Sequence, residues 1–326
     1  MIDLIRESET KKHFCILPFN SVQINQAQIS PCCKMGALET KNGSWKETMV
    51  RYFNNAQLKQ MQESFLDSRI PWKCSKCFSA GDTALYPSQK FNEYQKTIEA
   101  TGLDPVLPDS STPQLLNVIL TNACNLRCRH CDPSCSSSIN SVWTDELVKM
   151  TGTNKSKPFN SDELIDELLT FDKFHSVRNV LLSGGEPLML KRLYDITKKF
   201  KDSGCRKIGV VTNLSNDPFG YLPKLNEIGK SICASLTVSI DGDRPMHEYH
   251  RNLLDIDKFE ANVNSLGELE HIVLSVMIAV DAINVLSFTK LIDYIFAIFP
   301  RPPIFQLSIV ENSYLSMKVL PTELKK

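Results

Sequence analysis

The chain contains 326 residues, 42% of them hydrophobic and 23% charged, which is typical of a globular protein with a sizeable core. Its 37 lysine and arginine residues balance 37 aspartate and glutamate residues, so bulk charge gives no reason to expect a nucleic acid or an anionic membrane as partner. The charged N-terminus lacks the apolar core of a signal peptide. The most apolar stretch, 272–280, is too short to cross a bilayer. These features predict a cytoplasmic protein.

Eleven cysteines are present, and an odd number without a secretory signal argues against a disulfide framework. Most of them are clustered along the chain. The clusters comprise Cys15, Cys32 and Cys33, then Cys74 and Cys77, then Cys124, Cys128, Cys131 and Cys135. Clustered thiols in a reducing compartment indicate metal binding, whereas the isolated Cys205 and Cys233 are expected to be buried as small apolar residues.

Residues 1–82 are expected to form an N-terminal cysteine-bearing module. Residues 19–30 can form a hairpin that brings the first two cysteine positions together, and a CxxC pair closes the module. A set of four cysteines suits zinc as well as an iron–sulfur cluster, so a zinc ribbon remains open at this point. The expected ligands are Cys15, Cys32, Cys74 and Cys77, with Cys33 as the alternative to Cys32.

A segment rich in proline and serine, residues 83–112, reads as a linker. From 113 to 326, six apolar runs alternate with amphipathic helical segments. The runs lie at 115–120, 179–183, 207–212, 235–240, 271–279 and 304–310. Such near-continuous apolar strands predict a parallel sheet covered on both faces. Six strand–helix repeats are too few for a closed eight-stranded barrel, so we expect an α/β fold, a partial (β/α)6 barrel behind the small N-terminal module.

A cysteine loop of the form CxxxCxxC directly follows the first of these strands. Its cysteines are Cys124, Cys128 and Cys131. Three thiolates leave one iron of a four-iron cube open to a ligand, because such a cube usually takes four protein thiolates. The alternative is a structural zinc site, which needs a fourth ligand, and the position of Cys135 fits that geometry poorly.

With this loop, the chain resembles the radical S-adenosylmethionine (SAM) superfamily. The resemblance implies a [4Fe–4S] cluster on Cys124, Cys128 and Cys131 that reductively cleaves SAM to a 5′-deoxyadenosyl radical, which then abstracts hydrogen from a substrate. His130 takes the place that relatives give to an aromatic residue beside the adenine.

Further motifs follow in the order of that superfamily. The residues 183–187, SGGEP, are similar to its GGEP motif, and 238–242, VSIDG, to its SIDG motif. The resemblance implies that Glu186 accepts from the SAM ammonium and that Arg251 pairs with the SAM carboxylate, for which a planar guanidinium is suited. The SAM contacts expected in this way are His130, Gly184, Gly185, Glu186, Asn213, Ser239, Asp241 and Arg251.

The N-terminal module is similar to the auxiliary-cluster module of SPASM and twitch radical SAM proteins, although here it precedes the barrel instead of following it. This resemblance implies a second [4Fe–4S] cluster with four protein ligands, Cys15, Cys32, Cys74 and Cys77. Such a cluster is closed to substrate. It would transfer electrons or shape the substrate pocket.

The expected function is therefore that of a radical SAM enzyme with an electron donor such as flavodoxin or ferredoxin. Peptide or protein modification is the first expectation for its reaction, and oxidation of a small molecule such as a sugar or aminocyclitol is the alternative. A zinc-binding interaction protein is the non-enzymatic alternative, against which the intact GGEP motif argues. No general base is assigned; the candidates by residue type are His175, Asp241, His247, Tyr249 and His250.

Overall fold

The computed structural model describes residues 15–25, 27–33, 35–78, 113–157, 159, 162–168, 170, 177–310 and 314–325. The expected linker 83–112 and His175 lie outside the described residues. The chain divides into two compact units. The first comprises Met1–Ile119, Ser161–Leu181 and Lys198–Ile208, and the second comprises Leu120–Asn160, Leu182–Thr197 and Gly209–Lys326. The expected domain boundaries at 82 and 112 stay predictions, because they fall beside or within the segment that is not described.

The strands of the first unit begin with a hairpin. β1 (Ser21–Asn25) pairs antiparallel with β2 (Gln28–Ser30), which confirms the hairpin expected within 19–30. The short β3 (Glu39–Thr40) continues this arrangement by pairing with β2. On its other side, β1 pairs in parallel with β4 (Leu115–Ile119) over five residues. The first strand expected for the barrel is thus hydrogen-bonded to the cysteine-bearing module, a contact that the sequence did not predict.

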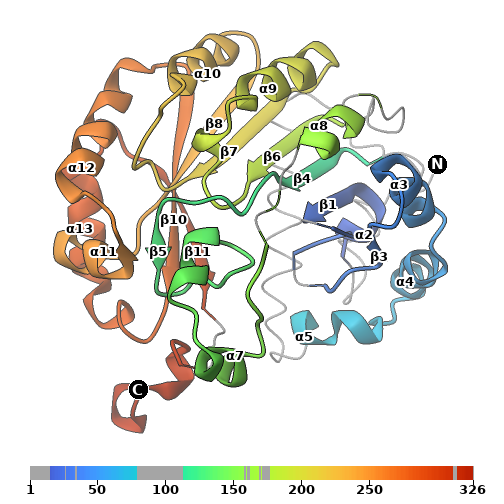
Figure 1. Cartoon of the computed structure of the whole chain (residues 1–326), viewed down its shortest axis with the longest axis horizontal. Coiled ribbons are helices and arrows are strands. Elements are labelled where there is room, and N and C mark those ends of the chain that lie inside the picture. The colour runs from blue at the N-terminus through green and yellow to red at the C-terminus, as the bar shows by residue number, and fades with distance from the viewer. Residues whose placement is uncertain are drawn as a thin grey trace. The chain divides into compact units, whose positions relative to one another are not determined.

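Two helices cover the strands of this unit, α3 (Trp45–Phe53) and α4 (Ala56–Leu66) (Figure 1). Asn55 separates them, because its side chain accepts from the backbone N–H groups of Gln57 and Leu58 and so starts a new helix. Their apolar residues recur at helical spacing and are almost fully buried, as Met49 and Phe65 illustrate. Aliphatic and aromatic burial therefore supplies this unit with a core of its own.

The larger sheet formed by the described residues has the strand order β11-β10-β8-β7-β6-β4-β1-β2-β3. Its remaining strands are β6 (Asn179–Ser183), β7 (Lys207–Thr212), β8 (Cys233–Ser239), β10 (Ile272–Val280) and β11 (Ile304–Ile309). β10 pairs in parallel with both β8 and β11. All six predicted strands are present within two residues of their expected ends, and the predicted α/β class with a parallel-strand sheet is confirmed.

Helices of the second unit include α10 (Tyr221–Gly229), α11 (Arg244–His250), α12 (Ile256–Ser265) and α13 (Phe288–Ile298). Figure 1 shows α12 and α13, in orange, side by side. Leu291 and Ile295 of α13 are fully buried, whereas Phe296 of the same helix is 54% exposed. The expectation of a buried Cys205 is confirmed, whereas Cys233 is only half-buried.

The remaining described helical segments, apart from α9, are seven residues or shorter. They are α2 (Leu17–Asn20), η1 (Trp72–Cys74), α5 (Ser75–Phe78), η2 (Ser137–Ser141), α7 (Asp145–Thr151), α8 (Asp162–Leu168), η4 (Pro187–Met189), α9 (Leu193–Asp202), η5 (Leu266–Glu268), η6 (Val285–Ser287), η7 (Met317–Val319) and η8 (Thr322–Lys325). Among the residues described, none of the helices is long and apolar enough to span a membrane.

Candidate active site

The three cysteines of the CxxxCxxC loop lie in the second unit, where a two-residue strand holds the middle one. β5 (Arg127–Cys128) pairs antiparallel with β9 (Arg251–Asn252), so that Cys128 lies opposite Arg251. The ligand atoms of Cys128, His130 and Cys131 all lie within 4.8 Å of one another. The loop thus gathers two of the predicted cluster ligands and the predicted adenine neighbour in one place.

The pKa values of these thiols depend on burial and on the hydrogen bond between two of them. The hydrogen bond between Cys131 and Cys128 lowers the pKa of Cys128 and raises that of Cys131. Burial raises the pKa of Cys124 to about 11. A metal must therefore displace thiol protons when it binds here, and its positive charge is what would stabilise three neighbouring thiolates.

The glycine pair of the GGEP motif packs directly against the backbone that leads into the cysteine loop. The Gly185 N–H donates to the Thr121 carbonyl at 2.6 Å, and the Glu186 N–H donates to the Ala123 carbonyl at 2.8 Å. A Cβ on Gly184, whose φ is +155°, would lie 2.5 Å from the Thr121 oxygen, and one on Gly185 would overlap the Ala123 carbonyl. Only glycine permits this close approach, which locks the two motifs together.

Glu186 is fully buried and accepts hydrogen bonds from three protein donors. They are the Leu188 N–H at 3.0 Å, the Thr212 hydroxyl at 2.7 Å and the Asn213 N–H at 2.7 Å. Burial nevertheless raises its pKa to about 7. A carboxylate has about four acceptor positions, so this one still has capacity for a cationic donor and would be stabilised by it.

Asn213, at the end of β7, connects this carboxylate to the cluster loop. Its amide nitrogen lies 3.8 Å from the Cys124 sulfur and 3.2 Å from the Asn125 side-chain oxygen. Its amide oxygen accepts from the N–H and the hydroxyl of Ser215, which fixes the orientation of the amide. The amide N–H groups therefore face a predicted cluster ligand.

Arg251 and Asp241 form a buried ion pair behind Cys128. The Arg251 Nε lies 2.8 Å from Asp241 Oδ2, and its Nη1 lies 3.9 Å from the Cys128 sulfur. Burial opposes the ionisation of Asp241, but Arg251 and nearby His130 more than offset it and lower its pKa to about 2. The Asp241 carboxylate also accepts from the Ala279 N–H at 3.0 Å, so this pair ties β9 and β10 to the cysteine loop.

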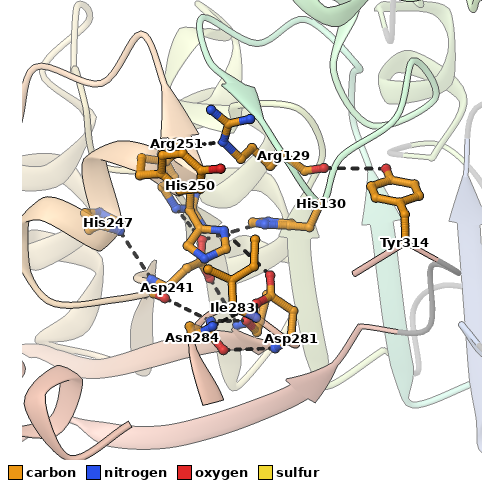
Figure 2. Close-up of polar contacts among 12 residues, drawn as sticks. Arg129, His130, Asp241, His247, His250, Arg251, Asp281, Ile283, Asn284 and Tyr314 are labelled. Carbon is orange, nitrogen blue, oxygen red and sulfur yellow. Dashed lines mark hydrogen bonds and ion pairs between the residues drawn. The ribbon is translucent and has the colours of Figure 1, made fainter. Parts of the chain in front are cut away.

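Histidines surround this ion pair (Figure 2). His130 Nε2 lies 3.9 Å from Asp241 Oδ2, and the His247 Nδ1 accepts from the Asp241 N–H at 3.2 Å. Burial lowers the pKa of His247 to about 3 and also lowers the pKa of His130 and His250. All three rings are therefore neutral at pH 7. His247 and His250 are fully buried, which favours a structural role over that of a base that contacts substrate.

Two further polar residues complete this network, and sequence reasoning missed both. Asp281 Oδ2 lies 3.6 Å from His250 Nδ1, and Asn284 donates to the carbonyls of Asp241 and Ala279. Both side chains are fully buried. The sequence could have indicated both residues as site candidates, because they follow the end of an apolar strand, where parallel sheets place ligand-binding residues. Ser239, at the end of β8, is half-buried beside this group.

We expect Asp241→Asn to lower the free energy of unfolding by about 3–5 kcal/mol, because it leaves the Arg251 guanidinium buried without its counter-charge. Chemical denaturation of the chain without SAM measures this. Asp257→Asn is the matched control: its ion pair with Arg244 is exposed, and exposed pairs contribute little. Equal stability losses in the two variants would contradict the assignment of a buried pair.

The N-terminal cysteines gather in the first unit. Cys15, Cys32 and Cys74 pack against the apolar cluster of Ile16, Leu17, Phe19 and Phe65. Burial raises the pKa of Cys74 to about 12, with Cys32 and Cys77 close enough to contribute. The same three thiols contribute to the raised pKa of Cys15. The four expected ligands therefore lie together, whereas the alternative ligand Cys33 is exposed.

The fold and the site together define a protein class: an α/β chain whose parallel sheet carries a cysteine loop hydrogen-bonded to a glycine turn. The three cysteines of the loop fit an iron–sulfur cluster, since thiolates are among the ligands that such clusters take. A family model described as the radical SAM superfamily matches residues 118–295, more than half of the chain. The chain belongs to the radical SAM superfamily, and it is an enzyme of that family.

Several proteins are similar to it in sequence. Human molybdenum cofactor biosynthesis protein 1 is 32% identical over 166 residues, covering 49% of this chain and 23% of that protein. The 7-carboxy-7-deazaguanine synthase of Rhodopirellula baltica is 25% identical over 219 residues, covering 63% and 73%. The match spans only 17% and 23% of the bovine and human molybdenum cofactor proteins.

Solved structures are also similar. Streptococcus suis SuiB gives a TM-score of 0.45 at 14% identity, covering 90% of this chain and 61% of that one. The structure titled native anSMEcpe with bound AdoMet and Cp18Cys peptide gives 0.44 at 15% identity, covering 60% and 50%.

Proposed function

We propose that this chain cleaves SAM reductively to a 5′-deoxyadenosyl radical and uses it to abstract hydrogen from a substrate. One observation carries the proposal: the glycine turn of 184–186 is hydrogen-bonded to the backbone at 121–123 that enters the cysteine loop. Cluster ligands and SAM-binding motif thereby form one rigid group. The cluster, when bound, supplies the electron that breaks the carbon–sulfur bond of SAM.

Different residues of the chain hold the cluster and bind SAM. Cys124, Cys128 and Cys131 would hold the cluster, which with only three protein thiolates would keep one iron open for SAM. The buried Glu186 carboxylate accepts from the SAM ammonium. Arg251, whose Nε is held by Asp241, directs its remaining donors at the SAM carboxylate.

Other residues position the rest of the cofactor. Asn213 fixes one side of the Cys124 thiolate, Ser239 contacts SAM from the end of β8, and His130 lies beside the adenine. The neutral His130 ring suits that place, because an aromatic face without charge stacks on a base. The buried Asp241 keeps both Arg251 and His130 in position, and the apolar strands around the group exclude water from a radical.

We further propose a second [4Fe–4S] cluster on Cys15, Cys32, Cys74 and Cys77, in an N-terminal twitch-type module ahead of a partial (β/α)6 barrel. Two observations support it: Cys15, Cys32 and Cys74 pack on the same apolar cluster, and Cys77 is close enough to Cys15 to contribute to its raised pKa. Four thiolates satisfy a cube fully, so this cluster transfers electrons or shapes the substrate pocket. The domain limits remain those expected from the sequence, with a linker at 83–112 and a cytoplasmic setting.

The proposed reaction is modification of a peptide or protein, the chemistry implied by the resemblance of the cysteine module. A small-molecule substrate is the second candidate. Relatives named GTP 3′,8-cyclase, 7-carboxy-7-deazaguanine synthase and AdoMet-dependent heme synthase favour it, because their names specify small molecules. Adding GTP to the reduced enzyme tests this second candidate. A faster formation of 5′-deoxyadenosine would support a small-molecule substrate.

Anaerobic reconstitution with iron and sulfide, followed by dithionite and SAM, tests the central proposal. We expect 5′-deoxyadenosine and methionine in equal amounts. A chain that binds zinc alone and yields neither product is an interaction protein instead.

We expect Glu186→Gln to weaken SAM binding by roughly tenfold or more while leaving the iron content intact, because a charge-assisted hydrogen bond is lost. The pH dependence is a second readout. Since burial raises the pKa of Glu186 to about 7, protonation at lower pH removes the charge that binds the ammonium. SAM affinity of the parent enzyme should fall below pH 7, by up to about tenfold per pH unit, whereas the variant should be nearly insensitive.

Calorimetric titration of SAM between pH 6 and 8 measures both effects. The raised pKa of Glu186 also makes the folding stability of the chain depend on pH. Because the folded pKa lies above the ordinary value of 4.5, the stability gained from neutral Glu186 is present below pH 4.5 and is lost as pH rises through 7. If SAM affinity depends on pH in the same way in parent and variant, the assignment of Glu186 is wrong.

A further inference from the structure

We propose that a groove around Trp72 in the N-terminal unit is the docking surface for a small acidic one-electron carrier protein, which delivers electrons at Cys74. This inference rests on the proposed second cluster. It adds to that cluster the place at which its redox partner binds.

A single short turn presents the two key side chains to different surroundings. η1 (Trp72–Cys74) begins after Pro71, and the Cys74 N–H donates to the Pro71 carbonyl at 2.9 Å. The Ser75 hydroxyl donates to the Trp72 carbonyl at 2.8 Å and fixes the turn. Cys74 packs on the apolar cluster of the module, whereas Trp72 is 80% exposed. An indole is thus held in solvent only two residues from a proposed cluster ligand.

Trp72 lies on the wall of a groove of about 250 Å³. One wall is a face of α4, formed by Gln57, Gln60, Met61 and Ser64, and the other is formed by residues 69–73. The lining combines the amides of Gln57 and Gln60 with the apolar side chains of Met61, Ile70 and Trp72, and Ile70 is partly exposed. Large exposed apolar side chains gathered around a hollow mark an interaction site, and tryptophan is enriched at the anchor positions of such sites.

The positive charge of the groove favours an acidic partner. Its charged lining residues are Arg69 and Lys73, both cationic. Lys73 Nζ lies 5.5 Å from the Trp72 ring centroid and donates to Gln57 at 2.8 Å, while Arg69 also pairs with the exposed Asp67. A basic rim around an aromatic anchor suits an acidic surface, because complementary charge raises association rates.

The small size of the groove also favours a redox carrier over a permanent subunit. Electron-transfer encounters are brief and bury less surface than stable complexes. A carrier seated on Trp72 would be next to the turn that ends at Cys74. Its reduced flavin or iron–sulfur group would give up one electron, and the second cluster would accept it.

The test compares two reductants on the full, reconstituted enzyme. Flavodoxin hydroquinone is the protein carrier, dithionite is the small reductant that needs no docking, and the readout is the ratio of their 5′-deoxyadenosine formation rates. We expect Trp72→Ala and Lys73→Glu each to lower the ratio about tenfold, and Trp72→Phe to preserve most of it. Lys59→Glu is the matched control, because Lys59 is exposed on α4 and does not line the groove.

The outcomes are distinct. A ratio that stays at the parent value in Trp72→Ala and Lys73→Glu overturns the proposal, as does an equal fall in Lys59→Glu. If Trp72→Ala keeps the ratio but changes the oligomeric state measured by light scattering, the groove binds a second copy and the proposal is wrong. Failure of the second cluster itself is seen separately, as absence of iron from a chain lacking the three barrel cysteines.

Discussion

Replacing Cys124, Cys128 and Cys131 together with alanine is expected to abolish 5′-deoxyadenosine formation. The three thiolates hold the proposed radical cluster, whereas the neighbouring Cys135 is exposed. The iron content should fall by about four per chain, the content of one cube.

The measurement is chromatography of the products after anaerobic incubation with dithionite, alongside iron analysis. Cys135→Ala is the matched control, since it removes a neighbouring thiol that the proposal does not use, and it should retain product formation. Reductive SAM cleavage by the triple variant would show that the central proposal is wrong.

The second large effect concerns the N-terminal thiols. In a chain that already lacks the three barrel cysteines, about four irons per chain should remain. Adding Cys74→Ala and Cys77→Ala should reduce this to none, because two thiolates cannot retain a cube. The Cys33→Ala control should keep its iron, since Cys33 is exposed while the four expected ligands lie together.

With the barrel cysteines intact, the variant lacking Cys74 and Cys77 should still cleave SAM without coupling to substrate. Its proposed radical cluster uses residues of the second unit, and the network around Arg251 does not involve the N-terminal thiols. Metal analysis that finds one zinc and no iron in the barrel-deficient chain would establish a zinc ribbon, and the electron-transfer role would be abandoned with it.

Local sequence signals predicted much of the framework. The six parallel strands could be predicted from their near-continuous apolar runs without any contact information. That pattern predicts cover on both faces, but β11 is largely exposed, with Ile304, Leu307 and Ile309 all more than half exposed. A short stretch of sequence was also enough to show the spacing of the loop cysteines and the position of Gly184 and Gly185 after the next strand. The hairpin of β1 and β2 could also be predicted locally, because polar and apolar residues alternate in these two short strands.

Other features depended on which distant residues meet. The parallel pairing of β1 with β4 joins residues about ninety positions apart, and no periodicity specifies a partner strand. Glu186 could be identified as a motif residue, but its raised pKa follows from complete burial among donors of Leu188, Thr212 and Asn213. The position of Asp281 and Asn284 after a strand could be seen in the sequence, but their partners are known only once β10 is placed beside Asp241.

The two kinds of information differ for a physical reason. Strand, turn and ligand spacing are set by steric and solvation preferences over a few residues, which the order of amino acids encodes directly. Burial, ion pairing and exposure are set by the free energy of packing segments that are far apart in the chain. The Asp241–Arg251 pair is hidden from water and the Trp72 ring is held in it, although the residue types alone would suggest the reverse. Only the tertiary structure decides which charge is buried and which aromatic ring is left exposed.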